Sequence, residues 1–120
     1  MSGLKKVGKY KSKYNNLLNV NLPVSDIYAS EGLNKHILRR HPNCQKYIEK
    51  IPEIINNPDY IGKNPKELDS IELVKVFDDN IQIGIKLDTN KNYLYVATLF
   101  DIKESKVQRR LNSGRLKALK

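Results

Sequence analysis

Both histidines of the chain lie within one short segment, beside two consecutive arginines, Arg39 and Arg40. His36 and Arg40 are four positions apart, so a helix would place them on one face. An imidazole exchanges a proton near neutral pH, and a guanidinium stays charged and can hold a phosphate with two hydrogen bonds. These residue types in this spacing suit cleavage of a phosphodiester bond without a metal ion.

The overall charge also indicates a partner rich in phosphate. The chain has 120 residues and a formal net charge of +9, from 22 Lys and Arg against 13 Asp and Glu. Such a charge can serve solubility alone, but a small basic domain also gains affinity for polyanions by releasing counterions from phosphates. We favour the second interpretation, with RNA as the partner and tRNA as one candidate target.

Cleavage of RNA through its own 2′-hydroxyl needs a base, an acid and cations that hold the phosphate oxygens. His36 is the first candidate for a proton carrier, and His41, just before Pro42, is either a second carrier or a structural residue. Arg40 is a candidate phosphate ligand or a plain surface charge. Thr98 is a lone hydroxyl in an apolar stretch, where it either binds a phosphate or is simply a good strand residue.

Other basic and aromatic residues of the second half could contact a substrate. The tyrosines alternate along one predicted strand and could stack on bases, and the cations could bind phosphates, although each has an ordinary surface role as its alternative. These candidates are Lys75, Lys86, Tyr93, Tyr95, Arg109 and Arg110.

Metal and cofactor chemistry finds little support in the sequence. The single cysteine, Cys44, excludes an internal disulfide and a multi-cysteine zinc site, and we interpret it as a small buried hydrophobe. His36 and His41 are five residues apart, off the usual metal-binding spacing on a helix. Glycine-rich phosphate loops and nucleophile elbows are absent. We therefore expect no metal and no cofactor.

Export and membrane signals are also absent from the sequence. No apolar run follows Met1, and the longest apolar stretch, from Tyr93 to Phe100, is far too short to span a bilayer. We expect a protein that is cytoplasmic as made and has no membrane partner. Delivery by a route other than Sec would leave no mark here.

We predict two parts along the chain. Residues 1–19 are expected to form a basic, partly flexible arm, in which lysines interleave with Tyr10 and Tyr14 and could track phosphates. Residues 20–120 are expected to form a single domain.

Within that domain, helices precede a sheet. A short strand is predicted at Val20–Leu22, a helix capped by Ser30 and ending by His41, and a second helix from Cys44 to Asn57 that Pro52 kinks or divides. Two alternating segments and a third that is apolar on both sides then predict three strands of an antiparallel meander, with the third as its central and most covered strand, and a last helix follows. These segments are 70–77, 81–87, 93–100 and 104–111.

The predicted fold class is therefore α+β, with N-terminal helices packed on one face of an antiparallel sheet. The other face should stay partly open. Gln82 and Lys86 would line it, together with either Lys75 or Glu72 from the neighbouring strand.

Four segments in series resemble a known nuclease family. They are Ser30-x-Gly32-Leu33-x-x-His36-Ile37-x-x-Arg40-His41-Pro42, Ile51-Pro52-x-Ile54-Ile55-x-x-Pro58-Asp59-Tyr60-Ile61-Gly62, Leu73-Val74-Lys75 and Leu94-Tyr95-Val96-Ala97-Thr98-Leu99. From about Ser25 to Leu116 the chain resembles the phage-associated members of the barnase, EndoU, colicin and RelE-like (BECR) nuclease superfamily.

This resemblance implies helices packed on a four-stranded antiparallel sheet and metal-independent cleavage of RNA. It also implies a catalytic set of His36, Arg40, His41 and Thr98, with Lys75 as a weaker member. Members occur in phage and prophage proteins and in toxin modules, so delivery with a phage particle and an acidic inhibitor or immunity protein are compatible with it.

The sequence thus predicts a metal-independent endoribonuclease that acts by transesterification through the 2′-hydroxyl. The alternative is a non-catalytic basic module, for nucleic-acid binding or phage assembly, on the same fold. Convergence of His36, Arg40 and Thr98 on a concave surface would favour the enzyme. A His36 buried among aliphatic side chains, or a Thr98 that faces the helices, would favour the binding module.

Overall fold

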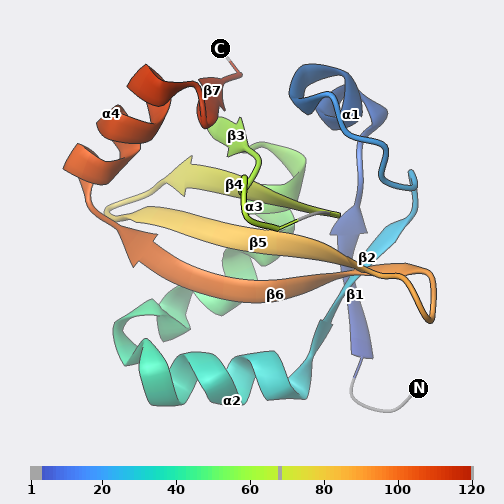
Figure 1. Cartoon of the computed structure of the whole chain (residues 1–120). Helices are drawn as coiled ribbons and strands as arrows, with labels where there is room; N and C mark the ends of the chain where they lie inside the picture. The colour runs from blue at the N-terminus through green and yellow to red at the C-terminus, as the bar shows by residue number, and fades with distance from the viewer. Residues whose placement is uncertain (1–3, 68, 120) are drawn as a thin grey trace.

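The predicted meander forms the centre of the sheet in the computed structural model, which describes residues 4–67 and 69–119 (Figure 1). Strands β4 (Ser70–Val76), β5 (Asn80–Asp88) and β6 (Tyr93–Ile102) pair in antiparallel order. The alternation that predicted β5 is confirmed, because Ile81, Ile83 and Ile85 are all fully buried on one face. Period-two patterning therefore located the middle of the fold.

The sheet is larger than the four-stranded antiparallel sheet that was expected. It has seven strands in the order β1-β2-β6-β5-β4-β3-β7, with β2 and β6 parallel, so the fold class is α+β with a mixed sheet. The additional strands are β1 (Leu4–Lys9), β2 (Asp26–Ser30), β3 (Tyr60–Gly62) and β7 (Leu116–Ala118). Strands as short as β3 and β7 carry too little alternation to be recognised from sequence.

Residues 4–19 differ from the expected arm, and residues 1–3 lie outside the part of the chain that the structure describes. Residues 4–19 contain β1 and α1 (Ser12–Leu18), and the side chains of Tyr10 and Tyr14 are buried. Their rings meet edge to face at 5.7 Å, and the Tyr14 hydroxyl donates to the carbonyl of Ile55 at 2.8 Å. The interleaving of lysine and tyrosine is thus an amphipathic pattern, and these two tyrosines are core residues that cannot stack on bases.

The helices follow the predicted signals with two corrections. Helix α2 (Glu31–Arg40) begins after Ser30, whose hydroxyl accepts from the Leu33 amide at 3.2 Å, as expected for an N-cap. The predicted second helix is divided, but just before Pro52, and its first half is a 3₁₀ helix, η1 (Pro42–Lys50), followed by α3 (Ile51–Asn56). The strand expected at Val20–Leu22 is displaced to β2.

The two faces of the sheet are covered unequally. The main hydrophobic core lies between the sheet and α2, η1 and α3. On the opposite face, α4 (Glu104–Ser113) packs through a small cluster that includes Val74, Ile102 and Val107. Figure 1 shows α4 at the end of the sheet where β6 terminates, with α2 running beside β6. The face beside α4 is here called the open face.

None of the described helices is long and apolar enough to cross a membrane.

Replacing Gly62 by alanine should destabilise the pairing of β3 with β7. An added Cβ would lie 2.7 Å from the Leu116 side chain and closer still to the carbonyl oxygen of Arg115. We expect the free energy of unfolding to fall by about 1–3 kcal/mol in urea denaturation. Gly32→Ala is the control, since its nearest neighbour, the Ser30 hydroxyl, is 3.6 Å away. Equal stability of the two variants would contradict the tight approach.

Candidate functional site

A register shift in β6 turns Thr98 toward the open face. Val96 pairs with Ile85 but Thr98 pairs with Gly84, so Ala97 is an extra residue in the ladder. Val96 and Leu99 are both buried in the core although they are three positions apart. Without the bulge, Thr98 would share the core face with Val96. With it, Thr98 and Phe100 join Tyr93 and Tyr95 on the open face.

Thr98 lies in a pocket of about 190 Å³ on that face. Its cross-strand partner Gly84 has no side chain, and a Cβ there would lie 2.7 Å from the Thr98 hydroxyl oxygen. The glycine therefore leaves the hydroxyl accessible. The pocket is also lined by Lys86 of β5, Phe100 of β6 and Arg110 of α4.

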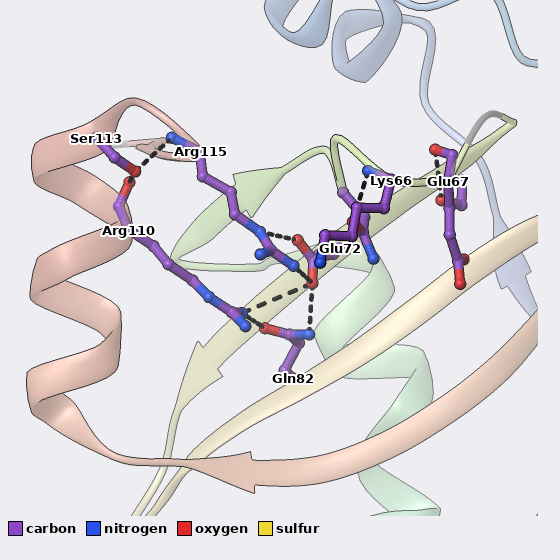
Figure 2. A network of polar contacts seen from close by, with 9 residues as sticks. Lys66, Glu67, Glu72, Gln82, Arg110, Ser113 and Arg115 are labelled. Atoms are coloured by element: carbon purple, nitrogen blue, oxygen red, sulfur yellow. Dashed lines mark hydrogen bonds and ion pairs between the residues drawn. The ribbon is translucent and has the colours of Figure 1, made fainter.

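A buried polar network forms one wall of this pocket (Figure 2). Glu72 accepts two hydrogen bonds from Arg115, at 2.9 and 3.0 Å, and one from the Gln82 amide at 2.7 Å. Arg110 donates to the Gln82 amide oxygen at 2.6 Å, and its guanidinium is 3.6 Å from the Glu72 carboxylate. The side chains of this network thus hold one another in place. They are Glu72, Gln82, Arg110 and Arg115.

The network carries more positive than negative charge, because one carboxylate serves two guanidiniums. Burial lowers the pKa of Arg110, and Arg115 and Arg109 lower it further, whereas Glu72 opposes these effects. An arginine nevertheless stays protonated in proteins. The wall therefore presents a cation that Glu72 neutralises only in part, which favours an anion in the pocket.

Ring contacts link His36 to His41 and His41 to Phe100, although neither histidine itself lines the pocket. The rings of His36 and His41 are 6.1 Å apart, and the His41 ring is 6.0 Å from that of Phe100. Both imidazoles are half-buried. Because Phe100 lines the pocket with Thr98, the rings of the two histidines and Phe100 form a row that ends at the pocket wall.

Comparison with known protein families identifies the family of the chain. Residues 5–109 match the family described as phage-Barnase-EndoU-ColicinE5/D-RelE like nuclease3. The chain belongs to this family. No curated protein and no solved structure matches the chain.

Membership of this nuclease family confirms the resemblance seen in the sequence, and the match includes most of β1 and all of α1. The chain is therefore assigned to a phage-associated family of nucleases, which act on nucleic acid. Among residues 4–67 and 69–119, no three His, Cys, Asp or Glu side chains gather as a metal-binding group.

The structure does not bring every candidate of this nuclease to the pocket. Lys75 lies on the helix side of the sheet, where it is buried and donates to the Asn57 carbonyl at 2.8 Å. Of the alternatives Lys75 and Glu72, it is Glu72 that reaches the open face. Arg40 is exposed on the last turn of α2, and Arg109 lines a neighbouring hollow with Phe100.

Phe100 and Arg115 are among the pocket residues that sequence reasoning missed. In the sequence Phe100 is only the last residue of an apolar stretch, and the pattern does not locate the bulge at Ala97 that turns it to the open face. Arg115 directly follows Gly114, which ends α4 in a left-handed conformation with φ of 85°. The glycine after the predicted last helix was the signal that the chain turns at this point. It could have indicated that Arg115 points back toward the sheet.

The turn after α2 is fixed by the free cysteine. The Cys44 amide donates to the His41 carbonyl at 2.8 Å, and its thiol contacts the Asp101 carboxylate at 3.5 Å. Burial tends to raise the pKa of Asp101, but hydrogen bonds from Asn43 and Cys44 and the nearby His41 outweigh it, so the pKa is lowered. Asp101 thus stays ionised beside the turn that carries His41.

Removal of the Glu72 carboxylate should destabilise the fold strongly. Glu72→Ala leaves Arg110 and Arg115 close together without their shared anion, and breaking such a buried ion pair costs about 3–5 kcal/mol. Glu67→Ala is the matched control, because its 2.9 Å ion pair with Lys86 is solvent-exposed and is worth less than about 1 kcal/mol. Chemical denaturation measures both, and losses of similar size would refute the central role of Glu72.

The Cys44 thiol should be unreactive in the folded protein. Burial, with a smaller effect from Asp101, raises its pKa to about 11, so the protonated form persists as the pH rises through the usual range for a thiol. At pH 8 we expect a thiol-specific reagent to label native protein at least about 100-fold more slowly than urea-unfolded protein. Equal labelling rates would mean that the thiol is neither buried nor protonated.

Proposed function

We propose that this nuclease is a metal-independent endoribonuclease that cleaves RNA by transesterification through the 2′-hydroxyl. The observation that carries the proposal is the row of rings from His36 through His41 to Phe100, which ends at a cationic pocket. The row supports the proposal because it leads from two imidazoles to Phe100, which lines the pocket together with Lys86 and Arg110. Imidazoles and cations are the components that the reaction needs.

In the proposed reaction one imidazole removes the proton of the 2′-hydroxyl, and the 2′-oxygen attacks phosphorus. The bond from phosphorus to the 5′-oxygen breaks, and the other imidazole, protonated, gives that oxygen a proton. The products are a 2′,3′-cyclic phosphate and a free 5′-hydroxyl. Arg110 and Lys86 would hold the phosphate oxygens, and the Thr98 hydroxyl would orient them. Arg40 and Arg109 would contact the flanking backbone.

Two features support catalysis over the non-catalytic module. His36 is only half-buried and contacts another imidazole, so it is not enclosed by aliphatic side chains. Thr98 faces the open side of the sheet and not the helices. Neither sign of a binding module is therefore seen at these two residues, although His36 and Arg40 do not line the pocket that holds Thr98.

The charge of the chain supports RNA as the substrate, with tRNA as one target, and would also attract an acidic inhibitor protein. We propose the context of a phage, prophage or toxin system, in which the protein is made in the cytoplasm and delivered with a phage particle or acts where it is made. An inhibitor would act by covering the cationic pocket.

Cleavage of labelled total RNA and tRNA in excess EDTA tests the reaction. We expect fragments that end in 2′,3′-cyclic phosphate, and a loss of about two to four orders of magnitude in rate for His41→Ala and for His36→Ala. Lys35→Gln is the control, because it removes an exposed charge from the same helix beside His36.

Intact RNA with wild-type protein, together with a salt-sensitive complex, would contradict the reaction and favour the binding module. A rate within threefold of wild type for a histidine variant would remove that histidine from the mechanism. Cleavage that requires added Mg²⁺ would exclude the metal-independent route.

A further inference from the structure

A row of cations and tyrosines crosses the open face at right angles to the strands. Lys6 of β1 pairs with Tyr28 of β2, Tyr28 with Tyr95 of β6, and Tyr95 with Lys86 of β5. Residues directly opposite each other in neighbouring strands project to the same face. The order across four strands is therefore cation, aromatic, aromatic, cation.

A third tyrosine completes an aromatic surface in this row. The Tyr93 ring lies 6.0 Å from that of Tyr28 and 5.9 Å from that of Tyr95, in edge-to-face and tilted arrangements. All three side chains are half-buried, so each is held by its neighbours and keeps part of its ring in solvent. We call Tyr28, Tyr93 and Tyr95 the tyrosine platform.

The cations at either end can exchange their present partners for phosphates. Lys6 contacts Asp26 at 3.2 Å and Lys86 contacts Glu67 at 2.9 Å, and all four side chains are at least 38% exposed. Exposed ion pairs of this kind contribute little to stability. A polyanion can therefore displace the carboxylates at low cost.

Lys86 also joins the platform to the pocket. It pairs with Tyr95 across β5 and β6, and it lines the pocket that holds Thr98 and Arg110. A chain that places one phosphate in the pocket would thus carry its neighbouring nucleotides over the tyrosines. The path runs from the pocket across Lys86 and the platform toward Lys6.

We propose that the tyrosine platform, with Lys6 and Lys86, is a subsite for unpaired nucleotides that flank the phosphate in the pocket. This inference rests on the proposed action on RNA. Aromatic side chains stack on bases of any sequence, but only where a base face is free, and in a duplex those faces are covered by neighbouring base pairs. The substrate class is accordingly single-stranded RNA, or a loop or end of a folded RNA.

Binding of a non-cleavable probe tests the subsite independently of catalysis. The probe is a fluorescent 2′-O-methyl RNA 12-mer, which cannot react through its 2′-oxygen, used single-stranded, annealed to its complement, or with abasic residues. Fluorescence anisotropy at fixed salt would compare wild type with Tyr28→Leu and Tyr95→Leu. Tyr28→Phe and Tyr95→Phe keep the rings as controls, and thermal unfolding checks that each variant folds.

We expect each leucine variant to bind the single strand about 5- to 100-fold more weakly, the effect of losing one stacked base. The phenylalanine variants should bind like wild type. With the duplex or the abasic probe, leucine variants and wild type should bind alike. Lys6→Gln should weaken binding and reduce its salt dependence, whereas Lys50→Gln, exposed on η1, should do neither.

Leucine variants that bind the single strand like wild type, or that lose duplex binding equally, would overturn the subsite. The cleavage assay separates this outcome from failure of the proposed reaction. Tyrosine-dependent binding without cleavage would retain the subsite and reject the reaction. Cleavage whose KM for single-stranded RNA is the same in leucine variants and wild type would retain the reaction and reject the subsite.

Discussion

The bulge in β6 is the constraint on which both faces of the sheet depend. The core needs Leu94, Val96 and Leu99, and a regular strand cannot turn Val96 and Leu99 to one side because they are three positions apart. One extra residue, Ala97, resolves this conflict. The same shift turns the Thr98 hydroxyl to the open face, opposite Gly84. Hydrophobic packing on the core face therefore determines which side chains of β6 lie on the open face.

The second organising feature is that hydrogen bonds fix the positions of the arginine side chains at the pocket. Glu72 and Gln82 fix two arginines that would otherwise repel each other, and they do so from adjacent central strands. Rigid cations lose little conformational entropy when they bind an anion. In the proposed function, Glu72 would therefore serve both the stability of the sheet and the positioning of the arginines that hold a phosphate.

Local patterns in the sequence predicted local structure well. Ser30 predicted the start of α2, and the alternating isoleucines predicted β5. What could not be predicted depends on contacts between distant segments. In the sequence, Tyr10 and Tyr14 look like residues that bind nucleic acid, but Tyr14 contacts the distant Ile55 and is buried. Lys75 looks like a cation of the open face, but the register of β4 turns it to the helix side. The alternation of cations and aromatics expected along residues 1–19 occurs instead across four strands.

The parallel pairing of β2 with β6 has a consequence for how the molecule folds. It joins Ile27 and Tyr28 to Leu94 and Tyr95, partners that are far apart in the sequence, and it forms only after a long loop has closed. The meander, built from near neighbours in the sequence, can fold first. A folding intermediate of this kind would contain Thr98 and Glu72 but would lack the contacts of Tyr28 with Tyr93 and Tyr95, so the tyrosine platform would form only when β2 docks against β6.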